Sequence, residues 1–174
     1  MPEGVDNVQG CPAELSIREV SRGDGAADIS AIASIVERCD AFSKEEKGCV
    51  LELLDIYLDD REDEGYFFRT AVVSGAPAGF ICYGATPLAD GVFDIYWIVV
   101  DADYRGKGVA TGLLKDTEKR LAEEGVRLIM AETSGQSGYA PARGFYERNG
   151  FQAEARIKGF YRPGDDLVVY VKRV

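Results

Sequence analysis

The stretch Arg105-Gly106-Lys107-Gly108-Val109-Ala110 separates a strand pattern from a helix pattern in this 174-residue chain. The strand pattern, residues 93–100, is rich in β-branched and aromatic residues. The helix pattern, residues 109–124, places its leucines on one face. Glycine lets a ligand approach the backbone closely, and the first N–H groups of a helix have no partner within it. The stretch therefore predicts an anion cradle, most simply for a diphosphate.

Two nucleotide-binding motifs fit this stretch poorly. The phosphate-binding loop of nucleoside triphosphatases needs Ser or Thr after its lysine, but Gly108 follows Lys107. The dinucleotide motif G-x-G-x-x-G needs its third glycine one position earlier than Gly112. Glu132 follows a second strand pattern, residues 126–131, where a ribose-binding carboxylate lies in that fold. A nicotinamide-dependent oxidoreductase is therefore an alternative.

A third pattern fits better. The spacing R-x-x-G-x-A, formed by Arg105, Gly108 and Ala110, resembles the pyrophosphate-binding loop of the Gcn5-related N-acetyltransferases (GNAT), which bind acetyl-coenzyme A. Residues 139–151 predict a short helix that ends at Gly150, and they resemble the family's F-Y-x-x-x-G-F segment. The resemblance covers residues 15–174 and is specific from 94 to 151. A non-catalytic acyl-CoA-binding module of the same fold is a further alternative.

The resemblance implies one α/β (α+β) acetyltransferase domain over residues 15–174, after a polar lead-in at 1–14. Its mixed, mostly antiparallel sheet has six to seven strands and is flanked by about four helices. Ser43 and Glu46 predict a capping box at the start of the second helix. The expected strands are 15–20, 66–73, 79–83, 93–100, 126–131, 151–157 and 167–172, and the expected helices begin near 26, 43, 109 and 140.

The resemblance also implies catalytic roles. Tyr146 matches the family's general acid, which protonates the departing thiolate. Glu132 matches the base of the branch that acetylates protein N-termini, and Asp94 matches the base of the histone-acetylating branch. We favour Glu132, with Asp94 or a bound water as alternatives. Because side chains alternate along a strand, residues 94, 96 and 98 are expected on one face.

Acetyl-CoA is the implied co-substrate. Backbone N–H groups on the strand before the loop would polarise the thioester carbonyl, and the loop would hold the diphosphate. The implied cofactor-binding residues are Ile98, Val99, Val100, Arg105, Gly106, Lys107, Gly108, Val109 and Ala110.

The expected acceptor is a primary amine of a small molecule or a protein. Two acidic segments, 59–64 and a hairpin loop at 160–166, lie where relatives admit substrate, and Tyr161 offers an aromatic wall. One departure weakens the peptide hypothesis. Tyr139 stands where the N-terminal-acetylating branch has an asparagine that contacts the cofactor, after an insertion at 135–138.

Composition narrows the chemistry further. The absence of histidine excludes His-dependent catalytic triads and histidine metal sites. Four cysteines without a C-x-x-C pair indicate neither a zinc site nor a disulfide framework, so no metal is expected. A net charge of −10 disfavours nucleic acid. Short apolar runs and a polar start predict neither a membrane span nor a signal peptide, and the scattered cysteines predict a reducing cytoplasm. The resemblance implies a homodimer as one option, because sheets of the family often pair at their edges.

Overall fold

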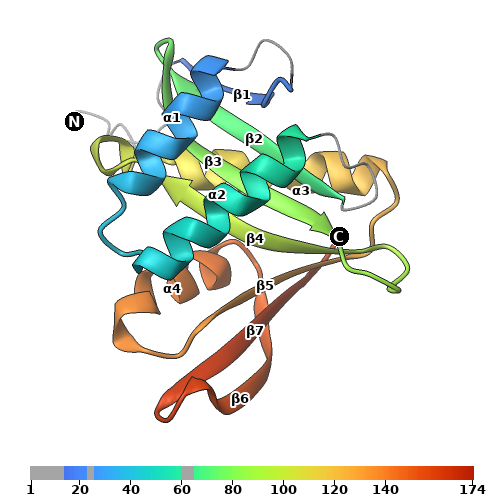
Figure 1. Cartoon of the computed structure of the whole chain (residues 1–174). Coiled ribbons are helices and arrows are strands. Elements are labelled where there is room, and N and C mark those ends of the chain that lie inside the picture. Colours follow the sequence, from blue (N-terminus) through green and yellow to red (C-terminus); the bar gives the residue numbers. More distant parts are fainter. Residues whose placement is uncertain (1–13, 23–25, 60–64) are drawn as a thin grey trace, which may run out of the picture.

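Seven strands form one sheet in the order β1-β2-β3-β4-β5-β7-β6 (Figure 1). The computed structural model describes residues 14–22, 26–59 and 65–174. Most of the expected lead-in and residues 60–64 of the first acidic segment therefore lie outside the described residues. The strands are β1 (Leu15–Glu19), β2 (Tyr66–Val73), β3 (Ala76–Ala85), β4 (Val92–Val100), β5 (Leu128–Ser134), β6 (Gln152–Arg162) and β7 (Asp165–Arg173).

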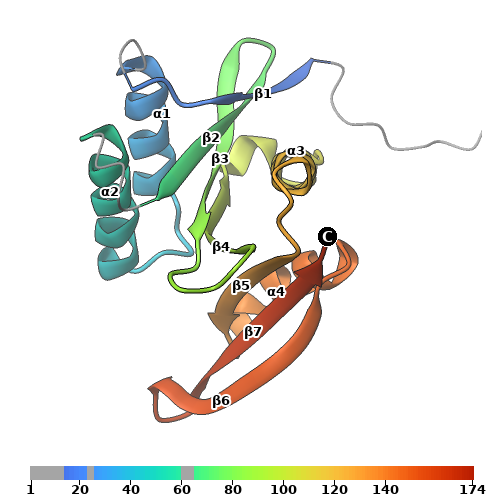
Figure 2. The same ribbon diagram turned by 90° about the vertical axis from the view of Figure 1, so that its right-hand side faces the viewer.

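Helices cover both faces of the sheet, as Figure 2 shows for α1 and α2 on one side and α3 on the other. The helices are α1 (Ala26–Glu37), α2 (Lys44–Leu58), α3 (Val109–Glu123) and α4 (Ala140–Arg148), with short 3₁₀ turns η2 (Ala102–Tyr104) and η3 (Ser137–Tyr139). One apolar cluster joins α1 and α2 to the sheet, and a second joins α3 and Tyr146 of α4 to the opposite face. We name the two sides the α1/α2 face and the α3/α4 face. The expected α/β fold is confirmed.

The start of α2 is built as its sequence predicts. The backbone N–H of Ser43 donates to Oε2 of Glu46 at 2.7 Å, and the backbone N–H of Glu46 donates to Oγ of Ser43 at 3.1 Å. This capping box satisfies helix N–H groups that would otherwise lack a partner. Among the described residues, no helix is both long and apolar enough to cross a membrane.

The parallel strands β4 and β5 pair over only part of their length. Their register runs from Val92 opposite Leu128 to Ile95 opposite Ala131 and stops there. Beyond this point β4 stays paired with β3, while β5 continues alongside β7. The strands β5, β7 and β6 therefore fan away from the rest of the sheet (Figure 2). The divergence leaves one edge of β4 from Tyr96 onward without a strand neighbour among the described residues.

A β-bulge at Tyr96 changes which residues of β4 share a face. Ile95 pairs with Tyr83 and Trp97 with Cys82, so Tyr96 is the extra residue. Ile95 packs in the α3/α4 cluster, Tyr96 and Trp97 pack in the α1/α2 cluster, and Ile98 returns to the α3/α4 side. The expectation that residues 94, 96 and 98 share one face is therefore wrong. Strand alternation predicts this only for an unbroken ladder.

Strands β5 and β6 both run past their expected C-terminal ends. β5 runs to Ser134, so Glu132 lies within the strand, paired with Val169, and not just past its end. β6 runs to Arg162, so the turn to β7 is only Pro163 and Gly164, and the expected hairpin loop at 160–166 is wrong. The extension of β5 pairs with β7 from Glu132 to Ser134, and β6 pairs with β7 again at Arg162 opposite Asp165 after an irregular stretch. Sequence patterns do not show such pairing.

Candidate active site

The loop between β4 and α3 leaves the start of the helix open. Gly106 and Gly108 have positive φ values of 73° and 80°, a conformation that glycine adopts most easily. Gly108 is the N-cap residue of α3 and offers no side chain to accept from the first helical N–H groups. A Cβ built on either glycine meets nothing within 4 Å. The loop conformation predicted from the sequence is therefore present, and it leaves the first backbone N–H groups of α3 open.

Two cations flank this cradle. The Arg105 side chain donates from Nε to the carbonyl oxygen of Val100 at 3.3 Å. The Lys107 ammonium donates to the carbonyl oxygen of Asp103 at 2.8 Å and lies 5.4 Å from the centre of the Tyr104 ring. Both side chains are exposed, so their charges remain available to an anion. The donor set, backbone N–H groups plus two cations, fits a diphosphate.

Asp101 holds the same loop in place, and the sequence analysis did not identify it. Its Oδ1 accepts from the backbone N–H of Asp103 at 3.0 Å, which caps η2. Its Oδ2 forms an ion pair with Arg38, which follows α1. Asp101 is 7% exposed, so the pair anchors the loop to the α1/α2 face. The only sequence signal for this role was the position of Asp101 directly after a strand, where an aspartate side chain often accepts from the backbone N–H two residues later.

Residues 98–100 of β4 contribute backbone groups. They pair with Ile81, Phe80 and Gly79 of β3 along one edge, while the other edge faces the divergence from β5. A Cβ on Gly79 would lie 2.6 Å from the carbonyl oxygen of Val99, so only glycine permits this close approach. The predicted use of these residues as carbonyl-polarising donors requires such a free edge.

Tyr146 lies in the α3/α4 cluster, packed between aromatic rings. Its ring centre is 5.5 Å from Phe145, 5.4 Å from Phe151 and 5.7 Å from Tyr170. Burial raises the pKa of its phenol well above the usual value, so the hydroxyl keeps its proton. Within the described part of the chain, this hydroxyl has no hydrogen-bond partner. It is therefore a buried proton donor without an acceptor among those residues.

Glu132 lies on the opposite face from Tyr146. Because Ile129 and Ala131 pack in the α3/α4 cluster, alternation directs Glu132 to the α1/α2 face. Partial burial, and then the charge of Asp94, raise the pKa of its carboxyl above the usual range. Asp94 itself accepts from Oγ1 of Thr86 at 2.5 Å. The structure thus brings the two candidate bases close enough to interact and occupies one of them with a hydrogen bond.

Three residues distant in sequence gather near Glu132. Oη of Tyr139 donates to Oε1 of Glu46 at 2.7 Å, which joins η3 to the start of α2. Burial, and then the charges of Glu132, Asp165 and Glu46, raise the pKa of Tyr161. We name Glu46, Glu132, Tyr139 and Tyr161, where the acceptor is expected, the amine side of the site. We name residues 105–110 with the start of α3, where the cofactor is expected, the cofactor side. The sequence singled out each of these residues, but not the contact between Tyr139 and Glu46.

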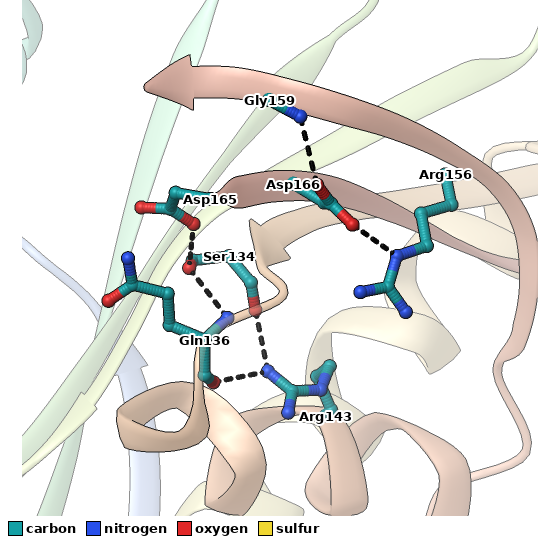
Figure 3. Close-up of polar contacts among 7 residues, drawn as sticks. All are labelled: Ser134, Gln136, Arg143, Arg156, Gly159, Asp165 and Asp166. Atoms are coloured by element: carbon teal, nitrogen blue, oxygen red, sulfur yellow. Dashed lines mark hydrogen bonds and ion pairs between the residues drawn. The ribbon is translucent and has the colours of Figure 1, made fainter. Parts of the chain in front are cut away.

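The end of β5 is held in place by a polar network (Figure 3). Nη1 of Arg143 donates to the carbonyl oxygens of Ser134 at 2.6 Å and Gln136 at 2.8 Å, which ties α4 to β5. The hydroxyl of Ser134 donates to Asp165 of β7. This network fixes the position of α4, and with it Tyr146, relative to the strand that carries Glu132. No sequence pattern predicts it beyond the polar residues themselves.

Metal ligands form no cluster in the described ranges. No group of three or more His, Cys, Asp or Glu side chains is arranged there to hold a metal ion. Cys39, Cys49 and Cys82 are free thiols.

Comparison with known proteins agrees with the family resemblance seen in the sequence. Residues 32–151 match the Acetyltransferase (GNAT) family. The chain belongs to the GNAT family. A solved putative acetyltransferase of the GNAT family from Desulfovibrio desulfuricans is 38% identical with a TM-score of 0.84, and the alignment covers 91% of this chain and 98% of that one. The expected family membership is confirmed.

Two more distant relatives complete the comparison. An uncharacterised N-acetyltransferase of Methanocaldococcus jannaschii is 28% identical over 110 residues, which are 61% of this chain but only 47% of that protein. The ribosomal-protein-S18-alanine N-acetyltransferase of Escherichia coli has a TM-score of 0.71 at 20% identity, covering 92% of this chain and 94% of that one. The second similarity shows a shared fold.

Proposed function

We propose that this GNAT protein is an acetyl-CoA-dependent N-acetyltransferase that moves an acetyl group to a primary amine within a ternary complex. One observation carries the proposal: Glu132 directly follows the last residue of β5 that pairs with β4, and Tyr146 packs on the opposite face of the sheet. A group threaded between the two strands reaches both side chains. A diphosphate in the cradle at the start of α3 anchors such a group at its other end.

The chain's own residues supply each proton transfer. Glu132 accepts the proton of the attacking amine, because a raised carboxyl pKa makes a better base. Backbone N–H groups of residues 98–100 stabilise the charge that develops on the thioester oxygen. A nitrogen–carbon bond forms, the carbon–sulfur bond breaks, and Tyr146 donates its proton to the departing thiolate. Burial raises the pKa of the Tyr146 phenol well above its reference value of about 10, so the phenol keeps its proton until the thiolate charge develops.

The amine side supports a cationic acceptor. Glu46, Glu132 and Asp165 place three carboxylates around Tyr161, and negative charge attracts an ammonium group before it loses its proton. The E. coli relative is named for acting on an alanine of ribosomal protein S18. A protein N-terminus, a lysine side chain and a small-molecule amine all satisfy this charge pattern.

The test has two stages. Calorimetric titration with acetyl-CoA measures cofactor binding, and mass spectrometry then detects acetylated products in a panel of peptides and small amines. Binding followed by a mass increase of one acetyl group supports the proposal. Binding without any product identifies a non-catalytic acyl-CoA-binding module. Binding of NADH in place of acetyl-CoA indicates the oxidoreductase alternative and contradicts the proposal.

A further inference from the structure

Asp101 links the sheet to the candidate cofactor loop through hydrogen bonds in both directions along the chain. Its backbone N–H donates to the carbonyl oxygen of Ala78 at 2.9 Å, which keeps the residue attached to β3. Its side chain accepts from the backbone N–H of Asp103 at 3.0 Å, and its carbonyl oxygen accepts from that of Tyr104 at 2.9 Å. Because η2 begins at the next residue, Asp101 fixes this turn relative to the sheet.

The two exposed cations of the loop bond to the chain segment around Asp101. Lys107 donates from its ammonium group to the carbonyl oxygen of Asp103 at 2.8 Å. Arg105 donates from Nε to the carbonyl oxygen of Val100 at 3.3 Å. Both acceptor residues lie within two positions of Asp101 in the sequence. A displacement of Asp101 therefore shifts the two cations relative to the start of α3.

Arg38 supplies the counter-charge of Asp101 from a distant part of the chain. It directly follows α1, and its guanidinium group forms an ion pair with Oδ2 of Asp101. A buried carboxylate is costly unless it is paired and hydrogen-bonded. The C-terminal end of a helix also favours a cation, so the place of Arg38 after α1 is itself favourable. The pair therefore holds the carboxylate of Asp101 in the orientation that caps η2.

We propose that Asp101, with Arg38 as its counterion, is a positioning residue for acetyl-CoA binding. The inference rests on the proposed function and assigns to it the residue that sets the conformation of the cofactor side. Asp101 acts through the loop, because it holds the segment to which Arg105 and Lys107 bond. Arg38 acts one step further away, because it holds the carboxylate of Asp101. Loss of the ion pair therefore weakens the binding of a diphosphate without removing any group that contacts it.

Calorimetric titration of the whole chain with acetyl-CoA, at low and at high salt, tests this role. Arg38→Met removes the ion pair, and we expect the dissociation constant to rise about tenfold. Salt screens exposed charges, so the affinity of the wild type is expected to fall as the salt concentration rises, and that of Arg38→Met to fall less. Arg38→Lys keeps the cation and is expected to retain most of the affinity of the wild type.

Asp101→Asn tests the same role from the other side of the pair. The amide keeps an oxygen that accepts from the N–H of Asp103 and removes only the charge that pairs with Arg38. We expect a loss of affinity similar to that in Arg38→Met. This variant leaves no unpaired carboxylate in a buried position, so it keeps the test decisive if a thermal melt shows that Arg38→Met folds poorly.

Arg18→Met is the matched control. Arg18 pairs with Asp28 at 2.7 Å and joins β1 to the first turn of α1. The side chains of this pair are 58% and 7% exposed, and those of Arg38 and Asp101 are 60% and 6% exposed. Asp28 and Arg38 lie ten positions apart, about 15 Å along a helix, so the control pair is remote from the loop. Arg18→Met is expected to lower the melting temperature about as much as Arg38→Met and to leave acetyl-CoA affinity unchanged.

The outcomes separate positioning from stability. Unchanged affinity in either Arg38→Met or Asp101→Asn overturns this inference and leaves the proposed function intact. An equal loss of affinity in Arg18→Met also overturns it, because reduced stability alone then explains the effect. Failure of the wild-type chain to bind acetyl-CoA overturns the proposed function as well.

Discussion

The cofactor side and the amine side of this site are built in different ways. The cofactor side comes from one continuous segment, residues 105–110 and the helix that follows. The amine side brings together α2, β5, η3 and the β6–β7 hairpin, and its bond between Glu46 and Tyr139 joins residues 93 positions apart. The first depends on local backbone conformation, and the second on the packing of the whole domain.

This difference decides whether a substitution changes the binding of acetyl-CoA or the reaction with the amine. A change on the cofactor side alters backbone donors that act whatever the acceptor amine is. A change on the amine side alters charge and shape that matter for the acceptor alone. If the division is right, variants of the two sides separate acetyl-CoA affinity from amine turnover.

The largest effect is expected at Tyr146, which lies on the α3/α4 face and belongs to neither side. Tyr146→Phe removes the proton donor, and loss of a general acid typically lowers kcat by about 10²–10⁴-fold. Because the hydroxyl has no partner among the described residues, thermal stability and acetyl-CoA affinity are expected to stay unchanged. Steady-state kinetics and calorimetry measure these effects.

Tyr170→Phe is the control for Tyr146. It removes the hydroxyl of a stacked neighbour 5.7 Å away, whose Oη donates to Glu147 at 2.8 Å. It is expected to cost some stability and to leave kcat within a few-fold of wild type. A kcat loss as large as that of Tyr146→Phe would show that ring packing, and not the proton, limits turnover.

The second-largest effect is expected from a substitution that disrupts the cofactor side alone. Gly108→Ala forces a side chain into a φ of 80° and directs a methyl group into the open cradle. We expect acetyl-CoA affinity to fall by about 10- to 100-fold, the loss of one or two hydrogen bonds to a charged group. Calorimetry measures the affinity. Gly75→Ala imposes a similar φ of 81° in the β2–β3 turn, and it should cost similar stability without loss of affinity.

Sequence predicted the local structure of residues 105–110 well because its signals are local, and the use of these residues as a cofactor site stays a prediction. Glycine at 106 and 108 is required by positive φ at those positions, and the helix begins at Val109 as expected. The capping box at Ser43 is likewise a short-range pattern that the structure contains. Neither prediction depends on which distant segments pack or pair with these residues.

Sequence predicted the amine side incompletely because its features are non-local. The bulge at Tyr96 depends on how β3 pairs with β4, and it reversed the face of Ile98 relative to Tyr96. The extension of β5 through Glu132 depends on pairing with β7. On the cofactor side, Asp101 was overlooked for the same reason, because its partner Arg38 lies in a distant segment. The roles of Glu132, Asp94 and Tyr161 stay predictions.

The third effect tests the amine side through the pH dependence of kcat/KM. A base works when deprotonated, so kcat/KM falls as pH drops through the raised pKa of Glu132. Asp94→Asn removes the neighbouring negative charge, lowers this pKa and should move the acid limb of the profile to lower pH. Glu132→Gln should remove the limb and lower kcat by about 10²-fold, while acetyl-CoA affinity persists. An acid limb that survives in Glu132→Gln would assign the base to another group.

The smallest effect is expected at the contact that spans the site. Tyr139→Phe removes a hydrogen bond of 2.7 Å to Glu46, worth about 0.5–1.5 kcal/mol of stability. The pKa of Tyr139 is raised to about 12, first by burial and then by Glu46, so the phenol remains a donor at neutral pH. Because the bond joins η3 to α2, its loss should raise KM for the amine a few-fold and leave acetyl-CoA affinity unchanged.

Glu46→Gln keeps an acceptor for Tyr139 and removes the negative charge. It therefore separates the loss of the bond from the loss of charge at the amine side. If KM for a cationic amine rises in Glu46→Gln but not in Tyr139→Phe, charge sets the affinity for the acceptor and the bond only adds stability. If Tyr139→Phe weakens acetyl-CoA binding as much as amine binding, Tyr139 belongs to both sides. The cofactor side, built from one segment, and the amine side, built from several, would then not be separate at Tyr139.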